Sequence, residues 1–373
     1  MFYKLLKGEE KMPEIKKVLL GMSGGVDSSV SAILLKEQGY DVTGITLHLF
    51  EGGCCNLDST LEAKAICQKL GIEHVTMNYK ELFKEKVINN FIDEYKNCRT
   101  PNPCIICNKF LKFGIMYNIA KKLGIDYIAT GHYAKNEFSN KYGRYVIRKP
   151  QNVKKDQSYF LYNIPKEVIP YVIFPLANYS SKDEIRKIAK EHDLSVANKP
   201  DSEDICFITN GDYKDFLEKN SDLKANSGNI VDTEGKILGQ HEGLYRYTIG
   251  QRKGLGISNS IPLFVVGFNK EKNELIVGKE DLLYNREAII SDVNLIAVDK
   301  ITKPMRVKVK TRYTAREAVA VLIPEISEIS DLENNKLKIL LDDAQRALTP
   351  GQSAVFYDEE GVLLGGGIID NYL

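Results

Sequence analysis

The sequence predicts an α/β N-terminal domain with a doubly wound parallel sheet, a mixed central domain and a β-rich, barrel-like C-terminal domain. Residues 15 to about 135 alternate short apolar runs with helical patterns, which is typical of a parallel sheet covered on both faces. The pattern is more helical and mixed from about 140 to 220. From about 225, glycine-rich turns separate short strands. A chain of 373 residues therefore forms two or three domains.

We place the domain boundaries where these patterns change. Residues 1–14 are an N-terminal extension. Residues 15–220 form the α/β domain, which runs into a mixed helical region from about 140. Residues 221–290 form the β-rich central domain, and residues 291–373 form the C-terminal barrel domain.

The α/β region contains four apolar strands and four helices. We expect the strands at 16–22, 41–50, 73–79 and 126–134, and the helices at 28–40, 59–72, 80–97 and 111–125. In such sheets, ligands bind at the carboxyl ends of the strands, where the topology switches. The loops after Leu20, Leu49 and Thr130 should therefore lie together.

Composition and charge indicate a soluble protein. Hydrophobic residues make up 43% of the chain, the net charge is +1, and no apolar run approaches the roughly 18 residues of a membrane helix. The N-terminal stretch has no continuous apolar segment of the kind found in secretory signals. Seven cysteines in such a chain indicate reduced thiols for catalysis or metal binding. We expect a cytoplasmic protein, either a monomer or a dimer.

The stretch GMSGGVDSSV, which begins at Gly21, predicts an anion site. Gly24 and Gly25 can adopt backbone angles closed to other residues and let a ligand approach the main chain. Ser28 and Ser29 are expected to open a helix whose free N–H groups and positive dipole end point into the same space. The Gly-Lys-Ser/Thr ending of the common P-loop is absent. A glycine-rich turn without a ligand is the alternative.

The segment SGGVDSS resembles the pyrophosphate-binding loop of the ATP pyrophosphatase superfamily. The resemblance implies an adenine nucleotide alpha hydrolase-like domain that splits ATP between the α- and β-phosphates and adenylates a carbonyl-type oxygen. It assigns Asp27 a further role in holding Mg²⁺. The implied ATP contacts in this loop are Gly21, Met22, Ser23, Gly24, Gly25, Val26, Asp27 and Ser28.

Two cysteine-bearing stretches indicate the substrate. NCRTPNPCIICNKFLKFG carries Cys98, Cys104 and Cys107, and KPDSEDICFI carries Cys206. Further matching segments are IATGHYA, KDQSYFLY, YTIGQRKGLGI, VKTRY, TPGQSAVFY and LGGGII. Because these segments occur in one order over nearly the whole chain, the sequence resembles the tRNA-specific 2-thiouridylases.

This second resemblance implies a reaction. The family adenylates the C2 oxygen of the wobble uridine in tRNAs for Lys, Glu and Gln, and sulfur then displaces AMP. Cys107 is implied as the nucleophile, and Cys206 as the carrier of the incoming persulfide. The expected sulfur donor is a cysteine desulfurase or another persulfide carrier, or sulfide where no persulfide is formed. The two cysteines can close as a disulfide when product leaves. Arg99 or Lys109 would favour the Cys107 thiolate.

The resemblance also implies contacts with the two substrates. Leu47 and Gly131 match nucleotide contacts. Residues 102 to 104 match the segment that faces the target base. The implied tRNA contacts are Asn102, Pro103, Cys104, His132, Lys155, Asp156, Gln157, Arg312, Tyr313 and Gln352.

The sequence departs from the family at Cys104, where many members carry aspartate. The resulting C-x-x-C, together with Cys206, resembles the site in other tRNA thiolases of the superfamily where three cysteines hold a 4Fe–4S cluster and leave one iron open. We therefore predict such a cluster on Cys104, Cys107 and Cys206. The alternatives are a persulfide relay with Cys104 as a bystander, a zinc site completed by Cys98, and inert packing.

Two further features leave alternatives open. Cys54 and Cys55 follow the second strand and either receive sulfur, supply a ligand or have no role. In MRVKVKTRY, alternation predicts a strand with four cations on one face, namely Arg306, Lys308, Lys310 and Arg312. That face is either solvated or, by the resemblance, in contact with tRNA phosphates.

Two other functions remain as alternatives. One is a small-molecule adenylating synthetase of the same superfamily, which would not need the cysteine set. The other is a non-catalytic tRNA-binding metalloprotein, which would not need the intact SGGVDSS loop.

Overall fold

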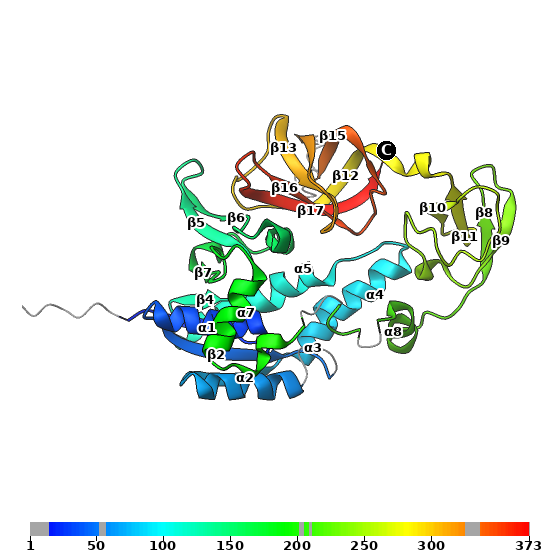
Figure 1. Cartoon of the computed structure of the whole chain (residues 1–373). Helices are drawn as coiled ribbons and strands as arrows, with labels where there is room; N and C mark the ends of the chain where they lie inside the picture. The colour runs from blue at the N-terminus through cyan, green and yellow to red at the C-terminus, as the bar shows by residue number, and fades with distance from the viewer. Residues whose placement is uncertain (1–14, 52–56, 201–204, 209–210, 325–335, 373) are drawn as a thin grey trace, which may run out of the picture.

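The computed structural model describes residues 15–51, 57–200, 205–208, 211–324 and 336–372. Figure 1 shows a parallel sheet with helices, a four-stranded sheet and a closed barrel, in that order along the chain. These three parts confirm the predicted fold class. The predicted extension 1–14 and the pair Cys54 and Cys55 lie outside the described residues. Among the described helices, none has the length and apolarity needed to cross a bilayer.

The N-terminal sheet is parallel throughout and has the order β3-β2-β1-β4-β7. Its strands are β1 (Lys17–Gly21), β2 (Asp41–His48), β3 (Glu73–Asn78), β4 (Tyr127–Ala129) and β7 (Val172–Ile173). Val18, Leu19 and Leu20 are fully buried because helices cover both faces, and this explains the continuous apolar run of β1. The strand order switches at β1, so its carboxyl end is the expected ligand position.

The helices of this domain differ in detail from the prediction. The helix expected at 80–97 consists of α3 (Lys80–Phe83), the π-helical segment η2 (Lys84–Ile88) and α4 (Asn89–Lys96). The helix expected at 111–125 begins earlier, at Pro103, because proline suits the first turn of a helix. It consists of α5 (Pro103–Cys107), the π-helical segment η3 (Asn108–Ile115) and α6 (Met116–Leu123). The first two helices are α1 (Val26–Glu37) and α2 (Leu57–Lys69).

The mixed region contains a hairpin, two capped helices and several 3₁₀ turns. The hairpin pairs β5 (Lys135–Ser139) with β6 (Arg144–Arg148). Ser181 caps α7 (Lys182–Glu191) and Asp212 caps α8 (Tyr213–Asn220), each by accepting a bond from a backbone N–H of the first turn. The 3₁₀ turns among the described residues are η4 (Val153–Lys155), η5 (Ser158–Leu161), η6 (Ile169–Tyr171), η7 (Ser195–Asn198), η8 (Leu244–Arg246) and η9 (Glu280–Leu283).

The last two parts are built from strands. The central sheet has the order β10-β11-β8-β9, with β8 (Gly228–Val231), β9 (Ile237–His241), β10 (Phe264–Asn269) and β11 (Glu274–Gly278). The barrel closes in the order β12-β15-β14-β13-β16-β17. Its strands are β12 (Tyr284–Leu295), β13 (Met305–Lys310), β14 (Ala318–Pro324), β15 (Leu337–Arg346), β16 (Ser353–Tyr357) and β17 (Leu363–Tyr372).

One apolar cluster joins the α/β domain to the barrel. It includes Phe91 of α4, Cys107 of α5, Tyr159 of η5 and Val355 of β16. Figure 1 shows α5 on the side of the α/β domain that faces the barrel. The helix that carries Cys104 and Cys107 is therefore packed between two parts of the chain.

Candidate active site

The loop between β1 and α1 has the geometry of an anion site. Gly24 has a φ of +69°, and a Cβ there would lie 2.7 Å from the carbonyl oxygen of Ser59, so a side chain is excluded. Gly25 has a φ of −98° and is the N-cap of α1. The expectation of special backbone angles is therefore confirmed for Gly24 and wrong for Gly25. The helix begins at Val26, two residues earlier than expected, because Gly25 already serves as the cap.

Serine hydroxyls hold this loop in shape. Ser28 Oγ lies 3.1 Å and Ser29 Oγ 2.8 Å from the carbonyl oxygen of Gly25, and both donate to it. Ser28 Oγ also accepts a bond from the backbone N–H of Ser23 at 3.3 Å. Met22 is fixed from β2, because its N–H donates to Ile45 O at 2.8 Å. The loop is thus preorganised by its own sequence and by the neighbouring strand.

The loop after β4 meets the same helix end. A Cβ on Gly131 would lie 2.9 Å from both the carbonyl carbon of Asp27 and the amide nitrogen of Ser28, so only glycine fits. This brings the implied nucleotide contact Gly131 against the phosphate loop. Leu47, the other implied contact, lies within β2 and is 8% exposed in the core.

The carboxylate of Asp27 is bound by two residues that were not among the predicted site residues. Lys182 Nζ lies 2.7 Å from both carboxylate oxygens, and Tyr133 donates its hydroxyl to Oδ1 at 2.7 Å. Lys182 is the first residue of α7, and its side chain is 13% exposed. An ammonium group on both oxygens does not fit the predicted Mg²⁺ on Asp27.

A second lysine reaches the same loop. Lys199 Nζ lies 3.5 Å from the carbonyl oxygen of Gly24 and pairs with Glu62 of α2. Lys182 and Lys199 follow the phosphate loop by more than 150 residues. The only local signal for Lys182 was its place behind the helix cap in SSKDE. Lys182 reaches Asp27 because α7 packs beside α1.

The C-x-x-C pair lies on α5 with unequal exposure. Cys104 is exposed, whereas Cys107 is 7% exposed and belongs to the shared apolar cluster. The guanidinium of Arg99 pairs with Glu94 at 2.7 Å and with Asp370 at 3.3 Å. Cys107 is therefore placed by packing on a helix.

Cys206 is held beside the same cluster. Its neighbour Phe207 packs edge-on against Phe83 and Phe91, with ring centroids 5.6 Å and 5.4 Å apart, and lies 5.0 Å from Phe216 of α8. Cys206 itself is half-buried and packs against the cluster that contains Cys107. The fold therefore joins both thiols, 99 residues apart in sequence, to one apolar core.

The structure does not support the predicted iron–sulfur cluster. Among the described residues, which include Cys104, Cys107 and Cys206, no three His, Cys, Asp or Glu side chains form a group that could hold a metal ion. The five described cysteines form no disulfide. Burial raises the pKa of Cys67 to about 11 and also raises that of Cys98, which disfavours their thiolate forms.

His132 lies at the same edge of the sheet. Its Nδ1 is 2.8 Å from Thr130 Oγ1, and its ring packs 5.8 Å from that of Phe113. Burial, with a smaller effect of Lys112, lowers the pKa of His132 well below its usual value. His132 is therefore neutral at pH 7. Asn102 is half-buried and Pro103 is buried at the start of α5.

Several implied tRNA contacts have internal partners. Asp156 is 6% exposed and accepts the N–H of Ser158 at 2.9 Å, and Gln157 accepts that of Tyr133 at 2.9 Å. The Tyr313 ring lies 4.5 Å from that of Phe160. Lys155 is half-buried in η4. Contacts within the chain therefore hold the side chains of Asp156, Gln157 and Tyr313 in place.

The predicted cationic face is shorter than expected. β13 alternates as predicted, with Val307 and Val309 buried, but it ends at Lys310, so Arg312 is not part of the strand. Arg312 instead donates to the carbonyl oxygens of Ala347 at 2.9 Å and Ile249 at 3.4 Å and to the hydroxyl of Thr349, which joins the barrel to the central domain.

Carboxylates pair with two cations of β13. Arg306 pairs with Asp342 at 2.5 Å, and Lys308 pairs with Glu359 at 3.4 Å. The stripe is therefore partly neutralised within the chain.

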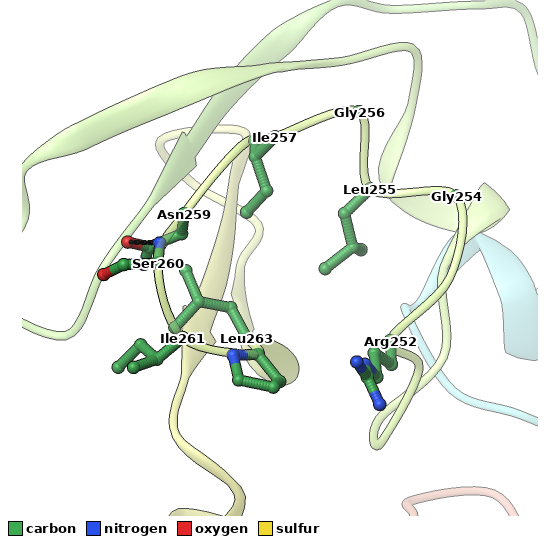
Figure 2. Close-up of a pocket in the computed structure, with 10 residues that line it drawn as sticks. Arg252, Gly254, Leu255, Gly256, Ile257, Asn259, Ser260, Ile261 and Leu263 are labelled. Carbon is green, nitrogen blue, oxygen red and sulfur yellow. Dashed lines mark hydrogen bonds between the residues drawn. The ribbon is translucent and has the colours of Figure 1, made fainter.

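Two of the hollows in the described part of the chain lie away from the phosphate loop. The one in Figure 2 belongs to the loop 252–263 of the central domain, where Arg252 stands at one side and Leu255 and Ile257 point inward. The other lies at the carboxyl end of β2 and combines Phe50 with Lys80, Lys84 and Lys219.

Together, the fold and the site define an α/β nucleotide-binding domain with two buried or half-buried thiols, joined to two β domains. Residues 16–210 match the tRNA methyl transferase HUP domain, residues 214–279 the tRNA methyl transferase PRC-barrel domain, and residues 285–369 the aminomethyltransferase β-barrel domain.

Curated relatives specify the family. The tRNA-specific 2-thiouridylases MnmA of Acetivibrio thermocellus and Clostridioides difficile are each 47% identical to the chain, over 95% and 96% of it and 99% of their own length. The enzyme MnmA 2 of Caldanaerobacter subterraneus is 46% identical over 96% of this chain and 99% of its own. The chain belongs to the family of tRNA-specific 2-thiouridylases.

Proposed function

We propose that this protein is an ATP-dependent tRNA-uridine 2-sulfurtransferase. The observation that carries the proposal is the joining of a phosphate loop and two thiols, Cys107 and Cys206, in one α/β domain. The near full-length similarity to 2-thiouridylases supports tRNA as the substrate. The reduced cysteines fit a cytoplasmic enzyme.

The first step activates the uridine. A uracil oxygen is a poor leaving group, so the C2 oxygen attacks the α-phosphorus of ATP and pyrophosphate leaves. The N–H groups at the start of α1 bind the anionic phosphates, and Gly24 lets them approach the backbone. Lys182 and Lys199 neutralise the carboxylates of Asp27 and Glu62 beside this loop, which lowers the repulsion that the phosphates would meet.

The second step replaces oxygen by sulfur. A persulfide on Cys206, loaded by a cysteine desulfurase or another persulfide carrier, attacks C2 with its terminal sulfur, and AMP leaves with the former C2 oxygen. The Cys107 thiolate then attacks the Cys206 sulfur. The S–S bond of the persulfide breaks, its electron pair stays with the sulfur on C2, and a Cys107–Cys206 disulfide forms. A cellular thiol reductant restores the two thiols.

Purified protein, ATP and tRNAs for Lys, Glu and Gln, with a persulfide donor, test the proposal. We expect 2-thiouridine in the tRNA, detected by retarded migration in a mercury-containing gel, and one AMP per sulfur transferred. Pyrophosphate release that does not require tRNA would instead indicate a small-molecule synthetase. Tight tRNA binding that survives Cys107→Ser, without any turnover in the unmodified protein, would indicate a non-catalytic binder.

A further inference from the structure

The barrel segment 349–353 holds the loop that leads into α5. Gln352 Nε2 donates to the carbonyl oxygens of Thr100 at 2.8 Å and Pro101 at 3.5 Å. In return, the N–H of Thr100 donates to Pro350 O at 2.8 Å. Three bonds therefore fix the loop just before Cys104.

The close approach of the two segments depends on a glycine. Gly351 has a φ of +88°, and a Cβ there would lie 2.8 Å from the amide nitrogen of Thr100 and 2.9 Å from Glu94 Oε2. Arg99, next to Thr100, adds an ion pair at 3.3 Å to Asp370 at the end of the barrel. Hydrogen bonds, an ion pair and a close backbone approach therefore hold the loop before α5 against the barrel.

The same barrel segment also reaches the other end of α5. The carbonyl oxygen of Ser353 accepts a bond at 3.0 Å from the hydroxyl of Tyr159, which is fully buried. The carbonyl oxygen of Phe160, the residue after Tyr159, accepts a hydrogen bond at 3.0 Å from the side-chain amide of Asn108. Asn108 is 2% exposed. Asn108 directly follows Cys107. Gln352 and Ser353 thus secure the chain before Cys104 and after Cys107.

We propose that residues 349–353 act as a clamp that positions Cys107, with Gln352 as its main positioning residue. Within the described part of the chain, Gln352 Oε1 accepts no hydrogen bond, so it remains for a donor on the RNA while Nε2 holds the loop. Binding of tRNA to Gln352 would therefore be linked to the position of the Cys107 thiol. This link rests on the proposed function, whereas the clamp itself does not.

Gln352→Met tests the clamp because it keeps the size of the side chain and removes the donor. Its matched control is Gln345→Met, since Gln345 lies on the same barrel and donates only to Asp343 O and Ala344 O of its own strand. We measure the alkylation rate of Cys107 without tRNA, single-turnover thiolation at saturating tRNA, and tRNA affinity. In Gln352→Met we expect altered alkylation of Cys107 and about tenfold slower sulfur transfer, because displaced reacting groups lose rate steeply. ATP affinity and the control stay unchanged.

Tyr159→Phe provides a second variant, which removes the bond at the far end of α5. We expect it to alter Cys107 alkylation in the same direction. The clamp is overturned if both variants leave alkylation unchanged, or if Gln352→Met weakens tRNA binding but reaches the normal rate at saturating tRNA. If the unmodified protein thiolates no tRNA, the proposed function fails, while the alkylation comparison still decides the clamp.

Discussion

The ammonium nitrogen of Lys182 lies 2.7 Å from both carboxylate oxygens of Asp27, across 155 residues of sequence. This ion pair ties the first turn of α7 to the first turn of α1. Tyr133 completes it from the loop after β4 through its bond to Asp27 Oδ1. The carboxylate beside the phosphate loop is therefore neutralised before any anion arrives.

Lys182→Met should weaken ATP binding by about tenfold or more, because it leaves the Asp27 carboxylate unpaired next to a polyanion. Isothermal titration with ATP measures this. The control is Lys187→Met, since Lys187 lies on the same helix with its side chain 77% exposed. Equal ATP affinity in Lys182→Met and the unmodified protein would show that Lys182 only stabilises the fold.

Gly24→Ala should cost about 2 kcal/mol or more in the free energy of unfolding and should abolish ATP binding. The left-handed backbone alone costs an alanine roughly 1 kcal/mol, and the added Cβ would lie 2.7 Å from Ser59 O. Gly39→Ala separates the two effects, because Gly39 also has a positive φ but no atom within 4 Å of its Cβ. Urea unfolding of both variants measures these changes. Equal losses in the free energy of unfolding would contradict the steric argument.

His132 should make the protein less stable at mildly acidic pH. Its pKa lies well below the usual 6.5 in the folded state, because burial disfavours the charged imidazolium. As pH falls below 6.5, the unfolded chain takes up a proton that the folded protein does not, so the free energy of unfolding falls. The loss is up to about 1.4 kcal/mol per pH unit for one proton. Between pH 7 and 5, the free energy of unfolding should decline less steeply in His132→Asn than in the unmodified protein. Identical slopes in the two proteins would refute this assignment.

The sequence alone was sufficient where a signal is local. The continuous apolar run of β1 and the glycines after it predicted a parallel strand and a turn into a helix, because backbone freedom and burial are properties of neighbouring residues. The start of α5 was missed because the predicted helix began only at Leu111, although proline at the first helical position is compatible with a helix.

Contacts between distant segments could not be predicted in this way. No local sequence pattern predicts that Lys182 pairs with Asp27, or that Gln352 donates to the carbonyl oxygen of Thr100. Each contact depends on how helices and strands far apart in the sequence pack together. The predicted cluster also depends on such packing, and the described residues do not support it. Spacing placed two cysteines on one helix, but the position of Cys206 is set by Phe207 and its aromatic neighbours.

Single-turnover thiolation of tRNA by Cys104→Ala, Cys107→Ala and Cys206→Ala, together with the visible spectrum of protein purified without oxygen, tests the central claim most directly. The account predicts a colourless protein that loses sulfur transfer in Cys107→Ala and Cys206→Ala and keeps it in Cys104→Ala. A coloured iron- and sulfide-containing protein that loses activity in all three variants would contradict it.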